Sequence, residues 1–466
     1  MHTTEQGAML RFVEGTLVLD NVSRGDFAPA PAGWAWDGRV GAWRCDASGY
    51  SRVTQLFTER GIAFKDAVPQ WQPIDWPYVS LPPLRPEQDR AVHAWLTPRR
   101  GVVVMPTGTG KTEVALAIMW ETAVSTLIVA PVRDLMYQWH DRIRLGLGYD
   151  AGIIGDNTYN LRPVSVTTYD SACIHMEKLG ALFGLLIFDE CHHLPGPLRR
   201  DAARMSAAPM RLGLTATPER SDGLHMDLAD LVGPTVYTLP LAHVRGRTLA
   251  DYDVVRIPVH LSADEQSHYD SLSGEIRRYM HDKVKEDRDY SWNDLCSDAG
   301  KDPESRRVQK AFHAKTAIED RAEEKLRVLE DLFRLHAGTR LIVFTGTNAM
   351  ARDVSRRFLV PCLLNHCRKK ERVEVLEGFR RGDYPVLVAN QVLDEGVDIP
   401  AAKVAVVIGG KGSIRQAKQR LGRILRRQGD ERAVLYEVVC AETREETRSR
   451  LRRKSDAYVR TSHRRV

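Results

Sequence analysis

A glycine-rich loop between an apolar run and a helical pattern constrains this chain more than any other feature. The run Gly101–Met105 reads as a strand, the loop is Pro106-Thr-Gly-Thr-Gly-Lys-Thr112, and Glu113–Met119 has the pattern of a helix. A strand, this loop and a helix in that order predict a phosphate-binding loop. The chain is therefore expected to contain an α/β domain that binds a nucleotide.

Each residue type in the loop has a task in phosphate binding. Gly108 and Gly110, with Thr109 between them, let backbone N–H groups turn inward toward a β-phosphate, and the helix start adds partial positive charge. Lys111 is expected to reach the β- and γ-phosphates, and the Thr112 hydroxyl to ligate Mg²⁺. ATP and Mg²⁺ are the expected cofactors.

A second motif, Asp189-Glu-Cys-His192, follows the apolar run Leu185–Phe188. Acidic side chains at the C-terminal end of a buried strand lie where open parallel sheets bind their ligands. Asp189 is expected to hold Mg²⁺, and Glu190 to orient and deprotonate the attacking water. His192 is suited to report the γ-phosphate to neighbouring elements.

An arginine-rich motif, Gln419-Arg-Leu-Gly-Arg-Ile-Leu-Arg426, lies on a predicted helix far from the other two motifs. Arg423 and Arg426 are three residues apart, so they point the same way. An arginine delivered by another domain can neutralise charge on a transferring phosphoryl group. A solvated basic helix face is the alternative, but the accompanying Gln and Gly residues favour catalysis. The motifs together predict an ATPase divided between two domains.

Upstream of the loop, Leu84-Arg-Pro-Glu-Gln88 offers an amide that could recognise adenine. The side chain of Gln88 carries a donor and an acceptor, so it can match N6 and N7 of the base together. Gln88 could instead be a surface residue of a helix. The phosphate loop that follows favours adenine recognition.

Two series of buried strands indicate the fold class, which is α/β with two parallel-sheet domains in tandem. Strands of the first series follow the glycine-rich loop, and those of the second series lie beyond residue 340. The runs are Thr126–Ala130, Val164–Val166, Leu185–Phe188 and Arg211–Leu214, and then Leu341–Phe344, Pro385–Ala389, Val404–Ile408 and Ala433–Tyr436.

The remaining segments differ in kind. Short alternating patches in residues 1–80 predict a small α+β domain, and a proline-rich linker, Trp76–Pro83, follows it. Five tryptophans in this part either fill a small core or, less favoured, stack on bases; they are Trp34, Trp36, Trp43, Trp71 and Trp76. Residues 262–335 are polar and helical in pattern, with little that could form a core, and indicate a helical projection plus a connecting helix.

The distribution of charge and the number of cysteines limit which partners and which cellular compartment are expected. The net charge is only +6, but basic residues gather late, from Arg415 to Arg427 and again from Arg448 to the C-terminus. A polyanion is one explanation for this tail and a solvated terminus is the other. Seven scattered cysteines without a Cys-x-x-Cys pair favour reduced thiols. With no apolar block of signal-peptide or membrane-spanning type, a cytoplasmic protein is expected.

The order of motifs resembles that of superfamily 2 helicases, and specifically the archaeal and bacterial XPB-like DNA helicases. Six segments carry the resemblance, and together they extend over nearly the whole chain. They are Leu84–Gln88, Ala130-Pro-Val-Arg-Asp-Leu135, Val166-Thr-Thr-Tyr-Asp170, Leu214-Thr-Ala-Thr-Pro-Glu-Arg220, Gln391-Val-Leu-Asp-Glu-Gly-Val-Asp-Ile-Pro400 and Gln419–Arg426.

The resemblance implies a domain organisation. Residues 1–80 would form a domain that senses distorted DNA, residues 81–245 a first RecA-like domain, and residues 246–466 a second one. A helical thumb would be inserted near residues 265–315. The resemblance also implies 3′-to-5′ movement on DNA and a role in nucleotide excision repair.

The resemblance further implies roles for individual residues. Thr215 and Thr217, together with Gln419, would couple the ATP and DNA sites, and Gly396 and Asp398 would lie beside the nucleotide and the strand.

Arg133 and Thr167 would contact the DNA backbone. The family has an Arg-Glu-Asp motif for strand separation, and this chain has Arg220-Ser221-Asp222 in its place. Arg220 and Asp222 would accordingly bind DNA.

That substitution leaves three functions to compare. The first is a monomeric repair helicase that unwinds single-stranded, forked or damaged DNA substrates. The second is a translocase that moves on duplex DNA without parting its strands. The third is a damage-binding scaffold whose ATPase gates its residence on DNA or recruits a partner nuclease.

Overall fold

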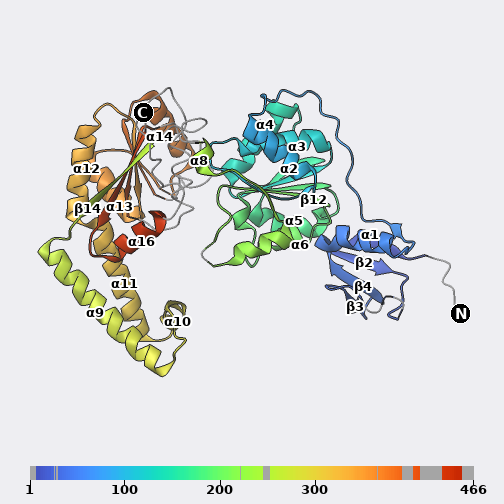
Figure 1. Cartoon of the computed structure of the whole chain (residues 1–466), viewed down its shortest axis with the longest axis horizontal. Helices are drawn as coiled ribbons and strands as arrows, with labels where there is room; N and C mark the ends of the chain where they lie inside the picture. Colours follow the sequence, from blue (N-terminus) through green and yellow to red (C-terminus); the bar gives the residue numbers. More distant parts are fainter. Residues whose placement is uncertain are drawn as a thin grey trace, which may run out of the picture. The chain divides into compact units, whose positions relative to one another are not determined.

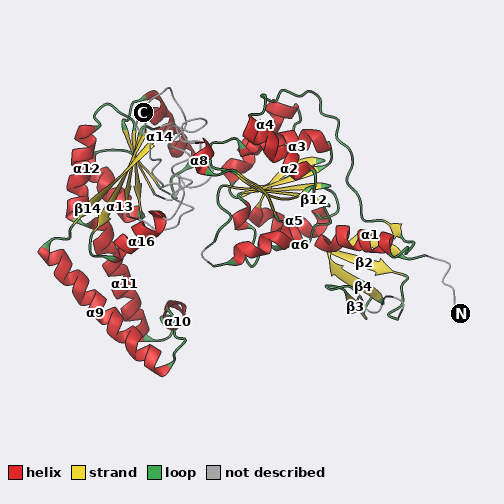
Figure 2. Cartoon of the chain, viewed as in Figure 1, coloured by secondary structure: helices red, strands yellow, loops and turns green. Residues whose placement is uncertain are grey.

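The computed structural model describes residues 7–25, 27, 30–220, 222–244, 252–364, 366–390, 402–409 and 433–453 (Figure 1). The chain divides into two compact units, one running up to His243 and the other beginning at Val244. The first unit holds a small sheet and a large sheet, and the second holds one sheet and a helical hairpin (Figure 2). No helix in the described ranges is both long and apolar enough to cross a membrane.

The N-terminal domain is a small sheet with one helix packed on it, as expected for residues 1–80. Its five strands are ordered β3-β4-β2-β1-β5. They are β1 (Met9–Val13), β2 (Thr16–Asp20), β3 (Ala35–Asp37), β4 (Ala42–Asp46) and β5 (Lys65–Asp66), with the 3₁₀ turn η1 (Ala47–Gly49) and helix α1 (Tyr50–Glu59).

Several aromatic side chains lie in the core of this domain. Phe27 lies edge-on to Trp34, Trp43 and Phe57, with ring centroids 5.3 to 5.8 Å apart. Trp43 is 8% exposed, which confirms the core interpretation for this ring, whereas Trp34 is half-buried at the margin of the core.

The N-terminal domain packs closely on the first large sheet domain. A Cβ atom on Gly180 would lie 2.0 Å from the carbonyl oxygen of Met205 and 2.7 Å from the ring of Phe12. Ala207, which belongs to the large domain, is buried in the N-terminal core. These two domains therefore form one unit.

The first large domain is a parallel sheet with an antiparallel edge, which confirms the expected α/β class. Its order is β13-β6-β12-β11-β7-β10-β8-β9, and only β8 and β9 pair antiparallel. The strands are β6 (Arg100–Val104), β7 (Thr126–Ala130), β8 (Gly152–Gly155), β9 (Thr158–Asn160), β10 (Val164–Thr168), β11 (Leu185–Asp189), β12 (Met210–Thr215) and β13 (Thr235–Thr238).

Helices cover both faces of this sheet (Figure 1). Helices α2 (Pro86–Leu96), α3 (Lys111–Thr122) and α4 (Arg133–Leu147) lie on one face, and α5 (Tyr169–Leu179), α6 (Asp201–Arg204) and α7 (Leu228–Leu231) on the other. Helix α8 (Leu241–Val244) follows β13. Burial on both faces explains why these strands are continuous apolar runs rather than alternating ones.

The second unit contains a fully parallel sheet in the order β14-β19-β18-β15-β17-β16. Its strands are β14 (Tyr252–Val259), β15 (Leu341–Thr345), β16 (Cys362–Leu363), β17 (Val386–Ala389), β18 (Val404–Ile408) and β19 (Ala433–Cys440). Its helices are α12 (Glu323–Leu335), α13 (Asn348–Phe358), α14 (Lys369–Arg381) and α16 (Arg444–Arg453). The second expected strand series is thus confirmed.

The projection between β14 and α12 is a hairpin of two long helices, α9 (Ala263–Glu286) and α11 (Pro303–Arg321), with the short helix α10 (Trp292–Asp298) between them. The core of the hairpin is small, as expected. Tyr279, Leu295 and Val308 form a buried cluster with one residue from each helix, and Trp292 packs against it.

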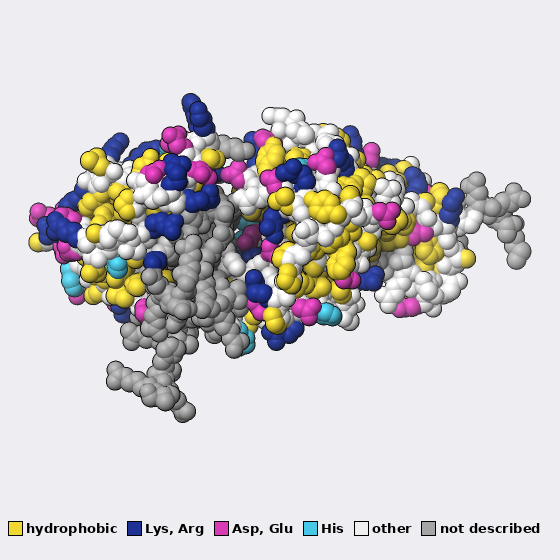
Figure 3. Space-filling model, turned by 90° about the horizontal axis from the view of Figure 1, so that it is seen from above, with side chains coloured by type: hydrophobic (Ala, Val, Ile, Leu, Met, Phe, Trp, Pro, Cys, Tyr) yellow, Lys and Arg dark blue, Asp and Glu magenta, His cyan; other side chains and the backbone are white. Residues whose placement is uncertain are grey.

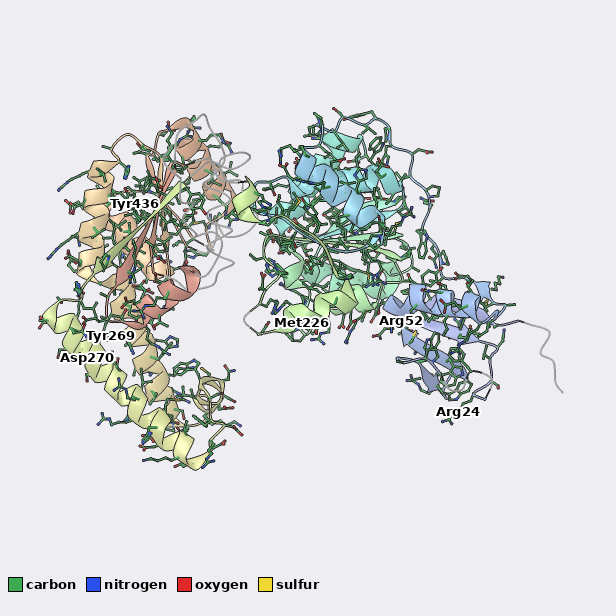
Figure 4. The ribbon with its side chains drawn as sticks, viewed as in Figure 1. Arg24, Arg52, Met226, Tyr269, Asp270 and Tyr436 are labelled. Carbon is green, nitrogen blue, oxygen red and sulfur yellow. The ribbon has the colours of Figure 1, made fainter. Side chains whose placement is uncertain are left out.

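Ion pairs join helix α16 to helix α12 and to the end of the hairpin at α11. Lys325 on α12 and Glu445 on α16 are both almost fully buried and lie 2.7 Å apart. Arg448 on α16 pairs with Glu319 near the end of α11, and the hydroxyl of Tyr269 donates to Glu319 at 2.8 Å. Figure 4 shows Tyr269 at the end of α9 that meets the sheet domain.

Replacing Lys325 by Met is expected to destabilise the second unit by about 3–5 kcal/mol, because the carboxylate of Glu445 would be left buried without its cation. Equilibrium urea unfolding measures the loss. The control is Arg327→Met on the same helix, because its ion pair with Glu324 is exposed and is worth about 1 kcal/mol or less. Equal stability of the two variants would contradict the prediction.

Candidate active site

The glycine-rich loop joins β6 to α3, and two of its glycines require left-handed backbone. Gly108 has φ +83° and Gly110 has φ +79°. A Cβ atom on Gly110 would lie 2.2 Å from the amide nitrogen of Gln88. Only glycine fits this position without displacing its neighbour.

Gln88 braces the loop rather than facing solvent. It is 2% exposed, and its Nε2 donates to the carbonyl oxygens of Thr109 at 3.0 Å and Gly110 at 3.3 Å. Its Oε1 accepts from the N–H of Arg85 at 2.8 Å, and the guanidinium of Arg85 also donates to Thr109 O. Adenine recognition by Gln88 stays a prediction, and it requires exchange of these hydrogen bonds.

Lys111, the first residue of α3, lies between the loop and the acidic motif. Its ammonium group donates to the carbonyl oxygen of Met105 at 3.3 Å and lies 3.9 Å from Oε1 of Glu190. Thr112 is the next residue of the helix. The ends of β6 and β11 thus bring the first two predicted motifs to one edge of the sheet.

Asp189 ends β11 and is almost buried. Its Oδ2 accepts from the indole N–H of Trp139 at 2.9 Å, and its Oδ1 accepts from the N–H of Glu190 at 3.0 Å. Burial, and then the charge of Glu190, raise the pKa of Asp189 to about 6. A cation bound here would lower that pKa again, so the environment of this carboxylate fits a metal ligand.

The backbone at Glu190 is unusual, with φ +46° in a residue that is not glycine. Such conformations cost free energy and occur at functional sites. Among the described residues, the buried hydroxyl of Thr107 in the loop has no hydrogen-bond partner. The loop, Lys111 and the carboxylates of Asp189 and Glu190 together fit a nucleoside triphosphate and its Mg²⁺.

His192 connects the acidic motif to the Thr215–Thr217 segment. Its Nδ1 lies 3.5 Å from Oε2 of Glu190 and shares a hydrogen bond of 3.0 Å with the hydroxyl of Thr215. That hydroxyl accepts from the N–H of Thr217 at 3.1 Å and donates to its carbonyl oxygen at 3.0 Å. The predicted coupling residues of this domain therefore form one continuous chain of contacts.

Arg220 extends this chain. Its guanidinium donates to the carbonyl oxygen of His192 at 2.7 Å and pairs with both carboxylate oxygens of Asp222. The positive charge of Arg220 is thus already engaged within the domain. Ser221, the central residue of this segment, lies outside the described residues.

The two residues predicted to contact the DNA backbone differ in exposure. Arg133, at the start of α4, is exposed and forms a 2.7 Å ion pair with Asp156 in the turn between β8 and β9. Tyr137 donates to the same carboxylate at 2.9 Å. The expectation for the Thr167 side chain is wrong, because Thr167 is fully buried and its hydroxyl donates to Ile154 O at 2.6 Å.

Five predicted site residues lie outside the described ranges. They belong to the second half of the chain and comprise Gly396, Asp398, Gln419, Arg423 and Arg426. Their roles remain predictions. On the face seen in Figure 3, Lys and Arg side chains are mixed with Asp and Glu side chains.

Two residues around Asp189 were not foreseen. Trp139 donates to its carboxylate, and the buried hydroxyl of Tyr169 donates to its backbone oxygen at 2.9 Å. Helix periodicity gives a weak signal for the first, because Met136, Trp139 and Ile143 recur on the buried face of α4. That face packs on the sheet beside β11.

Three protein families match parts of the chain. Residues 10–68 match the damage recognition domain of the xeroderma pigmentosum group B helicase. Residues 81–220 match the res subunit of type III restriction enzymes, and residues 324–428 match the helicase conserved C-terminal domain.

Relatives are similar over most of the chain. A protein of Sulfurisphaera tokodaii named DNA 3′-5′ translocase XPB2 is 40% identical over 95% of this chain and 99% of its own length. The DNA 3′-5′ helicase XPB of Kineococcus radiotolerans is 31% identical over 78% of this chain, which spans 61% of that protein. The corresponding helicase of Mycobacterium tuberculosis is 28% identical, and the chain again spans 61% of it.

Solved structures of low sequence identity share the fold. The helicase domain of Pyrococcus furiosus Hef aligns with a TM-score of 0.53 at 16% identity, over 78% of this chain and 97% of that one. Dbp5 of S. cerevisiae, bound to RNA and ADP BeF3, aligns with a TM-score of 0.54 at 16% identity, over 80% and 88%. These alignments support tandem RecA-like domains.

Proposed function

This chain belongs to the XPB family of superfamily 2 DNA helicases, and from that membership we propose that it hydrolyses ATP to move 3′-to-5′ along DNA and part its strands in nucleotide excision repair. One observation in the first unit supports the proposal most. Lys111, Glu190 and His192 are joined by short contacts that continue to Thr215. A change at the phosphate loop can thus reach the segment that ends at Arg220.

In the proposed mechanism, the N–H groups of the loop bind the β-phosphate, and Lys111 exchanges its contact with Met105 O for phosphate oxygens. Thr112 and Asp189 would hold Mg²⁺, which supplies charge neutralisation of the phosphates when bound. Glu190 orients the attacking water and takes its proton on a carboxylate oxygen.

The second domain is proposed to complete the reaction. Arg423 and Arg426 would neutralise the charge that develops on the γ-phosphoryl group, and Gln419 would couple that step to DNA. Gly396 and Asp398 would lie beside the nucleotide and the strand. Because these groups belong to another domain than Lys111, hydrolysis would require closure of the two domains.

Strand displacement on a 3′-tailed duplex tests this function. We expect ATP-dependent release of the tailed strand, with ATPase activity stimulated by single-stranded or forked DNA. Lys111→Ala is the control that should show neither. Release of a triplex-forming strand from blunt duplex DNA, without any unwinding of the tailed substrate, would contradict the helicase function.

That outcome would support a second candidate, a translocase on duplex DNA. Two observations favour it: Arg220 is engaged by Asp222 and by His192 O, and the Sulfurisphaera relative is named a translocase. A guanidinium held in this way is less available to a DNA strand. The same paired assay separates the two candidates.

A further part of the proposal concerns assembly. We infer a cytoplasmic monomer that acts on DNA with a partner nuclease, because the family resemblance implies such a partner. Light scattering of the purified chain tests the monomer. A scaffold that only recruits a nuclease would keep its recruitment in Lys111→Ala.

Replacing Asp156 by Asn is expected to tighten DNA binding by about 2- to 5-fold, because Arg133 and Tyr137 would no longer be held by a carboxylate. An exposed ion pair is worth up to about 1 kcal/mol, and a phosphate would replace the carboxylate as partner. Fluorescence anisotropy with labelled single-stranded DNA at fixed salt measures the change. Asp150→Asn, which loses the exposed pair with Arg162, is the control.

Unchanged affinity in Asp156→Asn would show that Arg133 does not contact the DNA backbone. Equal tightening in the Asp150→Asn control would instead attribute the effect to net charge.

A further inference from the structure

A hollow of about 170 Å³ opens in the N-terminal domain, between residues 31–34, the end of β4 and helix α1. An engineered protein cavity of about 150 Å³ holds a benzene ring. The hollow is therefore large enough for one six-membered ring, and too small for a long ligand.

Its lining combines an aromatic wall with polar groups. Trp34 lines one side, Val53 and Leu56 of α1 add apolar surface, and Asp46 and Ser48 add hydrogen-bonding groups. Trp34 is half-buried, and Phe27 supports it with an edge-on contact of 5.3 Å between ring centroids. An aromatic wall with a few polar groups is the chemistry that binds a nucleobase outside a duplex.

The lining of the hollow includes one cationic side chain. Arg52 is an exposed residue that lines it, and Figure 4 shows it on α1 beside the first large domain. Burial, and then the charge of Arg52, lower the pKa of Arg100 at the start of β6. The charge of Arg52 therefore acts on Arg100, which lies in the other domain of the same unit.

A third arginine, Arg211, lies beside Arg100 on the neighbouring strand β12. Arg211 is fully buried and donates to the carbonyl oxygens of Ser206, Ala208 and Leu231 at 2.6 to 3.3 Å. Burial, and then the charge of Arg100, lower the pKa of Arg211.

No carboxylate in the described part of the chain pairs with Arg52, Arg100 or Arg211. Arg100 is half-buried, and among the described residues the only hydrogen bond of its side chain runs from Nε to Val232 O at 3.3 Å. Buried cations are normally paired, and unpaired like charges repel one another. An anion bound at Arg52 would offset part of this positive charge.

We propose that this hollow binds one nucleotide of an unpaired DNA strand, with its base against Trp34 and its phosphate at Arg52, which both line the hollow. The proposal rests on the DNA-directed function above and adds a site to it. Extruding a base costs the least free energy where the base is mismatched or damaged. A site of this kind would favour such positions without reading the sequence.

The test compares duplexes with and without one unpaired 2-aminopurine nucleotide. Wild-type protein is expected to bind the bulged duplex more tightly than the matched one and to quench the probe, because the base would stack on an indole. Arg52→Glu and Trp34→Ala are expected to lose at least about fivefold of this preference, the scale of one base–aromatic contact. Arg60→Glu, an exposed arginine at the end of the same helix, is the matched control.

ATPase activity on plain single-stranded DNA separates this inference from the motor function. If that activity is normal but wild type shows no preference for the bulge, or if both variants keep the preference, the inference is wrong and the motor stands. If wild type shows no DNA-stimulated ATPase, the proposed function fails instead. Because Arg52 is exposed, its variant remains informative if Trp34→Ala does not fold.

Discussion

Glu190→Gln is expected to lower kcat for ATP hydrolysis by about 10²- to 10⁴-fold while ATP still binds, because the amide cannot accept the proton of the attacking water. The structure favours this residue as the base. Its carboxylate lies 3.9 Å from Lys111 and 3.5 Å from His192, on a left-handed backbone that directs it away from the regular path of β11.

Steady-state ATPase rates and equilibrium binding of a nucleotide analogue test both parts. The control is Glu113→Gln, a carboxylate on the helix that follows the loop, which pairs with Arg142 instead. An equal loss in both variants would indicate a general charge effect. An unchanged kcat in Glu190→Gln would assign proton transfer to another group.

Arg423→Ala is expected to lower turnover by roughly 10³-fold or more with nearly unchanged nucleotide affinity, because an arginine from the second domain acts on the charge of the transition state. Arg380→Ala is the control, an exposed arginine of the second unit that pairs with Glu377. Stopped-flow nucleotide binding and ATPase rates separate affinity from turnover. An equal loss of binding and turnover would contradict this role.

The sheet and the phosphate loop could be predicted because both leave strong local signals. A parallel strand covered on both faces is a continuous apolar run, as in β7 and β15. The loop requires glycine where the backbone is left-handed, as at Gly108 and Gly110. Such constraints act within a few residues, so the sequence displays them directly.

The sequence reveals least where contacts join distant parts of the chain. The role of Thr167 comes from the resemblance to the family's motif, and that motif does not reveal that Thr167 lies in a strand buried on both faces. The core of the helical hairpin draws Tyr279, Leu295 and Val308 from three helices, so no single segment carries its pattern.

The polar contacts were missed for a similar reason. Asp156 reaches Arg133 from a turn 23 positions further along the chain, which local propensity cannot anticipate. The sequence indicates that the amide of Gln88 can both donate and accept, but it does not indicate that the loop and Arg85 occupy both atoms.

The absence of a side chain at Gly180 bears on how the N-terminal domain and the ATP-binding domain could respond together to a DNA lesion. A Cβ atom at this position would clash with Met205 and Phe12, so the N-terminal domain packs closely on the domain that carries the phosphate loop. If the N-terminal domain bound a distorted nucleotide, that contact would directly oppose movement of the ATP-binding domain along the DNA. Stalling at a lesion would then need no separate signal between the two domains, because the N-terminal domain and the ATP-binding domain would move along the DNA together.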